Sequence, residues 1–458
     1  MESSRREICR SSAMSGEIVK LMLPLSFLFC ILFSSDQIPA PNQDHPIIIQ
    51  GATIHTVSDG ILEDAEILFN NGKIVSVGRN VSLMYGMEKI DGTGKHIYPG
   101  LISAGSTLGL QEIGAVRATR DYAEVGRINP NVRANVSYNP DSELIPISRS
   151  NGILLALSVP RSGLVSGMSS LMMLDGWTWE DATLKHPVGL HIFWPSMKVP
   201  KTEKGEKKEK AEPDSRLKSI QKIDDLIQES RAYLKLKESE SVSFKHDLRL
   251  EGMLPVLLGD IPIFIHANEV RQIEAAVYWA DRQNLDIVLV GGKDSWRTTT
   301  LLKEREIPVI YTQTHSTPMR RFENYDQAFT TPFQLYEAGV KFCISNSEST
   351  FQTPHIRNLP YYAAKAASYG LPWEEALRSI TLSTAEILGV EERVGSLDAG
   401  KDATFFIANG DILDIRTQVE RAYIQGREID LSDRHKMLYE KYKVKYQQKG
   451  LLKAPVSE

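Results

Sequence analysis

The sequence has 458 residues, of which 42% are hydrophobic and 24% charged, as in ordinary globular proteins. Its formal net charge is −5 and it has no basic stripe, which argues against a nucleic acid partner. This length fits two or three domains, or one barrel of about 250 to 300 residues with a small partner domain.

The first 45 residues have the pattern of an export signal followed by a linker. A basic lead ends at Lys20, and an unbroken apolar run follows over residues 21–33. This run is shorter than the roughly 20 residues that a membrane-spanning helix needs, and it suits the core of a signal peptide. We therefore expect an exported protein, periplasmic or secreted, that meets the membrane only through this segment. A retained anchor is the alternative.

The three cysteines offer little scope for disulfides or metal binding. Cys9 and Cys30 lie in the segment that we expect to be removed, which leaves only Cys343 in the mature chain. That chain could form neither an internal disulfide nor a cysteine-type zinc cluster.

Residues 46–98 alternate short apolar runs with turn residues. Asn71 and Gly72 stand between two such runs, 67–69 and 74–77. An Asn-Gly pair in this setting is a strong hairpin signal. This part of the chain is therefore predicted to be a small β unit.

Residues 99–390 follow a different rhythm, in which strand-like and helical stretches alternate. The clearest unit is a buried strand over 261–265 that ends at His266, a helix over 270–284 and a second strand over 287–290. This alternation is typical of parallel βα units, so we predict an α/β fold.

Three further segments complete the predicted organisation. Residues 198–245 are rich in Lys and Glu and indicate a solvated, partly disordered helical insertion. Residues 391–430 return to short strands, and residues 431–458 form a charged helical tail.

Three stretches, 91–102, 382–389 and 394–403, resemble motifs of the amidohydrolase superfamily in their order and spacing, particularly its imidazolonepropionase-like branch. The resemblance implies a (β/α)8 barrel over 99–390 and a β-sandwich formed jointly by 46–98 and 391–430. It also implies hydrolysis of carbon–nitrogen bonds other than peptide bonds in small molecules, at the carboxyl ends of the barrel strands.

The resemblance also implies a metal site, in which a divalent ion such as zinc activates water. The family's five ligand positions correspond here to Gly105, Thr107, His266, Gly291 and Asn346. Only His266 keeps a family ligand, because glycine has no ligand atom and the threonine and asparagine oxygens bind zinc weakly. Asn346 also cannot accept a proton as the family's aspartate does.

Substitute ligands are available in the loops that should surround this face. They are Gln111, Glu112, Asp121, Glu124, His315, Glu348 and His355. We predict a pocket lined by Glu112, His266, Asn268, His315 and His355, with an acid-rich metal site of Glu112, His266 and His315 as one interpretation. Loop salt bridges and helix caps are the other interpretation of these acids.

Two functions stay open at this stage. One is a hydrolase of the amidohydrolase superfamily with a remodelled metal site and a small-molecule substrate. The other is a catalytically inactive exported barrel that binds a small molecule or a protein partner. Metal-free chemistry is a third possibility, and assembly into a homo-oligomer is compatible with all three.

Overall fold

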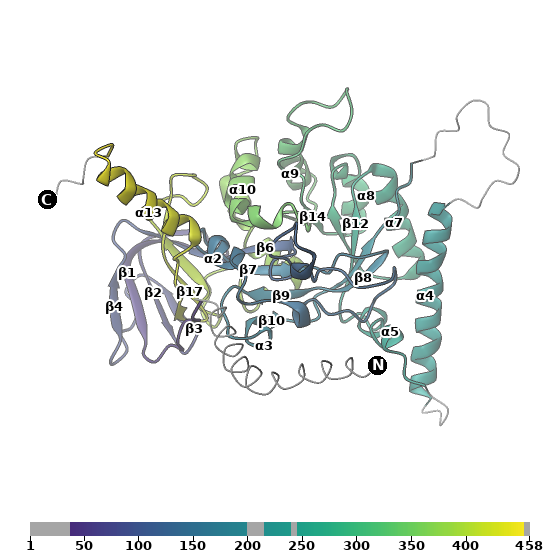
Figure 1. The fold of residues 1–458 in the computed structure, drawn as a ribbon, viewed down its shortest axis with the longest axis horizontal. Helices are drawn as coiled ribbons and strands as arrows, with labels where there is room; N and C mark the ends of the chain where they lie inside the picture. Colours follow the sequence, from purple (N-terminus) through teal and green to yellow (C-terminus); the bar gives the residue numbers. More distant parts are fainter. Residues whose placement is uncertain (1–36, 199–214, 240–244, 453–458) are drawn as a thin grey trace, which may run out of the picture. The chain divides into compact units, whose positions relative to one another are not determined.

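A computed structural model describes residues 37–198, 215–239 and 245–452. The predicted signal segment, up to residue 36, and the start of the charged insertion, 199–214, lie outside these residues. Within them the strands form three sheets, one of eight, one of four and one of six strands (Figure 1). No helix of the described part of the chain is long and apolar enough to cross a membrane.

The eight-stranded sheet contains strands from both ends of the chain. Its order is β18-β17-β16-β5-β1-β2-β3, and β4 pairs with β1. The strands are β1 (Ile47–His55), β2 (Ile61–Asn70), β3 (Lys73–Gly78), β4 (Glu88–Asp91), β5 (His96–Pro99), β16 (Phe405–Ala408), β17 (Val419–Ile424) and β18 (Arg427–Glu428). The antiparallel pairing of β5 with β16 joins the two ends. The strand pairing shows one sheet, so the two-layer β-sandwich stays a prediction.

The hairpin between β2 and β3 forms as the sequence predicts. Asn70 pairs with Lys73, which leaves Asn71 and Gly72 as a two-residue turn. Both turn residues have positive φ, 49° and 76°, the combination that a type I′ turn requires.

Aromatic packing joins the two ends of the chain inside this sheet. The Phe69 ring of β2 lies edge-on to the rings of Phe405 and Tyr423, with centroid distances of 5.1 and 5.0 Å. All three side chains are fully buried. Each such pair adds about 0.5–1.5 kcal/mol beyond its buried area.

A buried carboxylate, Asp402, makes a polar link between the two ends. It accepts hydrogen bonds from Lys73, Gln425 and Arg393 at 2.6, 3.0 and 2.7 Å. Burial alone would raise the pKa of Asp402, but the bonds from Lys73 and Gln425 and the charge of Arg393 outweigh it and lower the pKa below 3.8.

This lowered pKa predicts acid sensitivity. A carboxyl whose pKa is depressed by folding stabilises the protein above its unfolded pKa of about 3.9, and the contribution is lost as the pH falls through the folded value. We expect the stability advantage of the wild type over Asp402→Asn to shrink below about pH 4. Urea unfolding of both proteins from pH 7 to pH 3 measures it, and a constant difference would contradict the assignment.

The α/β region contains the other two sheets. Their orders are β10-β9-β7-β6 and β15-β14-β13-β12-β11-β8. The strands are β6 (Leu101–Ser106), β7 (Ile153–Ser158), β8 (Val165–Met168), β9 (Ser170–Met173), β10 (Thr183–Lys185), β11 (Leu190–Phe193), β12 (Ile263–Ala267), β13 (Ile287–Gly291), β14 (Val309–Tyr311) and β15 (Phe342–Ile344). No ladder among the described residues joins these two sheets, so a closed barrel stays a prediction.

Strands β11 to β15 are parallel, and helices connect β12 to β15 as βα units require. The connecting helices are α7 (Val270–Gln283), α8 (Thr299–Glu304) and α9 (Gln327–Glu337). A capping box of Glu269 and Gln272 starts α7, and Asn284 ends it in the left-handed conformation. The predicted helix over 270–284 is therefore confirmed.

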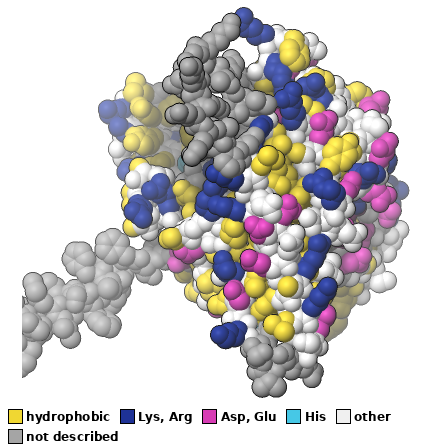
Figure 2. All heavy atoms as spheres, turned by 90° about the vertical axis from the view of Figure 1, so that its right-hand side faces the viewer, with side chains coloured by type: hydrophobic (Ala, Val, Ile, Leu, Met, Phe, Trp, Pro, Cys, Tyr) yellow, Lys and Arg dark blue, Asp and Glu magenta, His cyan; other side chains and the backbone are white. Residues whose placement is uncertain are grey.

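The charged insertion forms a long helix, α4 (Ser215–Glu238). The expectation of a solvated helix is wrong for one face, because Ile223, Leu226 and Ile227 are buried. Asp224 also accepts a hydrogen bond from the Trp279 indole of α7 at 2.8 Å. On the face of the molecule that Figure 2 shows, basic and acidic side chains are interspersed.

The tail forms α13 (Arg434–Gln448), and none of its residues is buried. Asp433 caps this helix by accepting hydrogen bonds from the backbone of His435 and Lys436. The helix predicted for the charged tail is therefore present.

Candidate functional site

The candidate site lies where the parallel strands of the six-stranded sheet end. His266 is the fourth residue of β12, and the residue is 8% exposed. Its Nδ1 lies 3.3 Å from Oε1 of Glu348, and its Nε2 lies 2.8 Å from Nδ1 of His191. Three titratable side chains from different parts of the chain therefore form one line, the Glu348–His266–His191 relay.

Strand register explains why the two histidines meet. In the pairing of β11 with β12, His191 lies opposite Phe264 and Phe193 lies opposite His266. Alternate residues of a strand share a face, so all four rings lie on the same face. Phe193 stacks on His266 with a centroid distance of 4.0 Å and an interplanar angle of 10°. This packing fixes the orientation of the imidazole.

The charges within the relay differ between its two ends. Burial raises the pKa of the Glu348 carboxyl, but the neighbouring His266 and Arg161 outweigh burial and lower the pKa to about 2. Burial and the neighbouring His266 lower the pKa of His191 well below its usual value. Near neutral pH the relay therefore has a carboxylate at one end and a neutral imidazole at the other.

The far end of the relay has an unsatisfied atom. His191 is 1% exposed, and its Nε2 has no hydrogen-bond partner in the described part of the molecule. When His266 donates from Nδ1 to Glu348, its Nε2 accepts from Nδ1 of His191, and Nε2 of His191 keeps a free lone pair. In this tautomer, the lone pair of that nitrogen is buried and unpaired among the described residues.

The donors at this site do not fit a divalent metal. Both ring nitrogens of His266 are already engaged, one with Glu348 and one with His191. Gly105, Thr107 and Asn346 supply no strong ligand, as the sequence indicates. Among residues 37–198, 215–239 and 245–452, no group of three or more His, Cys, Asp and Glu side chains could hold a metal ion. We therefore assign no step of chemistry to a metal here.

The segment after β15, residues 345–355, crosses from the end of that strand to the end of β6, and its last three residues begin the 3-10 helix η4 (Thr353–Asn358). We call this segment the crossing loop. Thr353 and Thr107 share a hydrogen bond of 2.5 Å between their hydroxyls, and Gln111 donates to the Thr350 carbonyl at 3.2 Å. Asn346 donates to the His355 carbonyl at 3.2 Å. The crossing loop thus contacts β12 through Glu348 and the residues after β6 through Thr353 and Thr350.

Gly291, at the end of β13, stands where the resemblance implies a ligand histidine. Its φ is +100°, a conformation that side chains rarely adopt. An added Cβ would lie 2.7 Å from Oδ1 of Asn268. The backbone at this position is therefore shaped for glycine.

The five residues predicted to line one pocket have separate partners in the structure. Glu112 accepts from the backbone of Glu143 at 3.0 Å, and the His315 ring packs edge-on against Tyr362 at 4.5 Å. His355 bonds the Phe351 carbonyl through Nδ1, and Asn268 accepts from the backbone of Lys293. The interpretation of Glu112, His266 and His315 as an acid-rich metal site is therefore wrong for the described residues.

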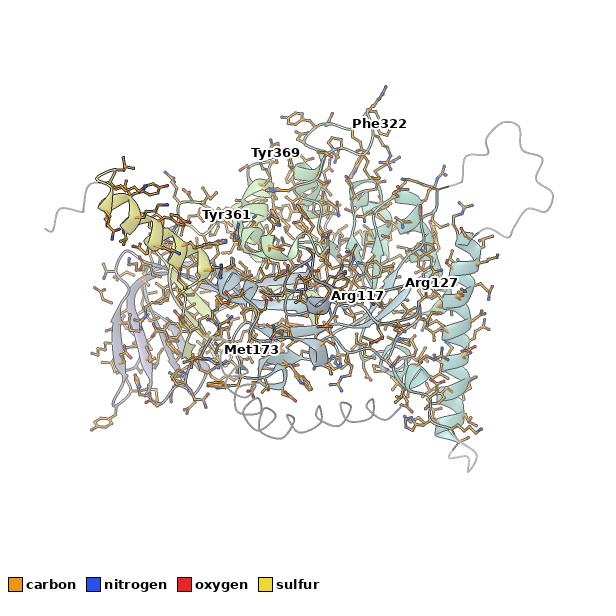
Figure 3. The ribbon with its side chains drawn as sticks, in the orientation of Figure 1. Arg117, Arg127, Met173, Phe322, Tyr361 and Tyr369 are labelled. Carbon is orange, nitrogen blue, oxygen red and sulfur yellow. The ribbon has the colours of Figure 1, made fainter. Side chains whose placement is uncertain are left out.

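Other candidates lie in the long connection between β6 and β7. Asp121 and Glu124 belong to this connection, as do Arg117 and Arg127, which Figure 3 labels. Of the predicted substitutes, only Glu348 contacts His266. Sequence reasoning missed His191, although it alternates with Phe193 in a strand next to that of His266.

Comparison with known proteins finds that part of the chain is similar to amidohydrolases and imidazolonepropionases. The model of the amidohydrolase family matches residues 338–430. Over 92 residues the chain is 30% identical to the amidohydrolase tasK of Hapsidospora irregularis and 34% identical to an imidazolonepropionase of Shewanella sp. (strain MR-4). These alignments cover 20% of this chain and 9% and 21% of the relatives. The chain thus spans less than a quarter of the length of these curated relatives.

A solved structure extends the likeness over most of the chain. The crystal structure of an amidohydrolase from Thermotoga maritima MSB8 superposes with a TM-score of 0.74 at 28% identity. The match covers 84% of this chain and 99% of that one. Over most of its length the chain is therefore similar to this amidohydrolase, and within residues 338–430 it also matches the amidohydrolase family, in line with the resemblance in the sequence motifs.

Proposed function

We propose that this protein hydrolyses a carbon–nitrogen bond, other than a peptide bond, in a small molecule, and that it does so without the family's metal. The observation that carries the proposal is the Glu348–His266–His191 relay at the carboxyl ends of the strands. A carboxylate that orients a histidine is the arrangement by which many hydrolases activate a nucleophile. The predicted closed barrel and the predicted export belong to this proposal.

The relay can take up and return one proton. In the proposed step, water gives a proton to Nε2 of His191, whose Nδ1 proton moves to Nε2 of His266. The resulting charge on His266 faces the Glu348 carboxylate, and the hydroxide attacks the carbon of the scissile bond. The same proton then returns along the relay to the leaving nitrogen.

Removing the charge at Glu348 tests this proposal. General acid–base groups contribute about 10²- to 10⁴-fold to rate, so we expect Glu348→Gln to lower kcat/KM by about that factor. The probes are N-acyl amino acids, cyclic ureides and imidazolones, assayed with and without chelator. We expect the chelator to leave the rate unchanged.

The matched control is Glu251→Gln, which removes another partly buried carboxylate. Glu251 bonds Tyr233 and Lys237 far from the relay in sequence, and its side chain is 20% exposed against 13% for Glu348. We expect wild-type rates for this variant. Equal rates for wild type and Glu348→Gln would contradict the assigned role.

A specific observation favours a second function, a non-catalytic barrel that binds a small molecule or a protein. His191 is 1% exposed and His266 is 8% exposed, so the described surface gives a substrate little direct access to their nitrogens. No turnover of any probe by the wild type, together with a thermal shift on ligand addition, would support this function over hydrolysis.

A further inference from the structure

The crossing loop stands where the family's metal ligands would converge. It reaches the end of β12 through Glu348 and the residue after β6 through Thr353. In the family, ligands at these strand ends would point at one ion. In this protein the same strand ends are joined by protein atoms.

The space at Gly105 supports this arrangement. A Cβ added to Gly105 would lie 3.6 Å from the carbonyl oxygen of Asn346, which is ordinary van der Waals contact. The Asn346 backbone therefore already lies in van der Waals reach of the first side-chain atom that any larger residue at position 105 would add.

The loop is anchored by polar contacts at several points. The side chain of Thr107 is fully buried and that of Thr353 is 1% exposed, so their 2.5 Å hydrogen bond is shielded from water. Gln111, 5% exposed, holds the Thr350 carbonyl. A buried polar group that loses its partner is costly, so these contacts hold the loop in place.

We propose that residues 345–355 replace the metal as the element that holds the strand ends of the site together. The loop is a fixed part of the fold, and its position does not depend on an ion. This inference goes beyond the proposed hydrolysis, because it holds whether or not the protein turns over a substrate.

Hydrogen exchange of the full chain, read peptide by peptide, tests the inference. We expect amides of 345–355 in the wild type to exchange at least tenfold more slowly than an unstructured peptide. One equivalent of zinc, or excess chelator, should change neither this protection nor the melting temperature. Faster exchange, or protection that needs zinc, would overturn the inference.

Two substitutions test whether the hydrogen bonds from Thr107 and Gln111 protect the crossing loop itself, and not only the stability of the whole protein. Thr107→Val and Gln111→Leu each remove one bond to the loop, and we expect either to speed exchange in 345–355 by about three- to tenfold, with no rescue by zinc. The control is Thr331→Val, which removes a buried hydroxyl bonded to the Gln327 carbonyl in α9. Loop protection that is equal in the Thr107 and Gln111 variants and the control would overturn the inference. A hydrolysis assay on the same samples reports separately on the proposed function.

Discussion

Replacing Asp175 with alanine is expected to destabilise the protein by about 3–5 kcal/mol, because the buried Arg149 and the partly buried Arg427 would lose their shared counter-charge. The Asp175 carboxylate lies 3.4 Å from Arg149 and 2.8 Å from Arg427. The three side chains are 2%, 6% and 13% exposed. Arg149 ends α2 (Leu144–Arg149) and Arg427 begins β18, so this carboxylate also links the α/β region to the eight-stranded sheet.

The comparison for this prediction is an exposed ion pair. Asp414 pairs with Arg416, whose side chain is 87% exposed. Exposed pairs contribute about 0–1 kcal/mol, so Asp414→Ala should cost little. Urea unfolding at pH 7 measures both variants, and similar losses in the two would show that burial does not amplify the Asp175 interaction.

Replacing Gly291 with alanine should cost about 2–4 kcal/mol, from the strained backbone together with the contact against Asn268. The same reasoning applies more strongly to Gly291→His, the change that would restore the family residue. We expect that variant to be less stable than wild type. Zinc should not raise its melting temperature, because both ring nitrogens of His266 already contact Glu348 and His191.

Gly400→Ala separates the two costs. Gly400 has a φ of +92°, close to that of Gly291, but an added Cβ would meet no atom within 4 Å. Only the backbone cost of about 1–2 kcal/mol should remain. Thermal unfolding of the two alanine variants measures the difference, and equal destabilisation would mean that Asn268 moves aside freely.

Local signals in the sequence predicted much of the fold. The Asn71–Gly72 turn and the helix over 270–284 are confirmed because each is determined by residues close in sequence. The resemblance implies only that 46–98 and 391–430 share one β unit; the pairing of β5 with β16 was not predicted, since periodicity alone cannot pair distant strands. The resemblance also implies a closed (β/α)8 barrel, but the observed strand pairing gives two separate sheets in this region.

The candidate site was harder to predict, because it depends on which loop side chain reaches a given strand end. Glu348 and Glu112 look alike in sequence, yet only Glu348 contacts His266. The path of the crossing loop, 345–355, decides this, because it places Glu348 beside His266. His191 could have been found from register, since a polar residue in an otherwise apolar strand needs a partner on the same face.

The joining of β5 to β16 has a consequence for synthesis of the chain. A ribosome releases β5 long before β16, so the edge of β5 that β16 will cover stays open while the whole α/β region is made. An open strand edge is a template for pairing with other chains. Chains that stop before Phe405 should therefore aggregate through this edge, and the eight-stranded sheet should be completed only after β16 to β18 have left the ribosome.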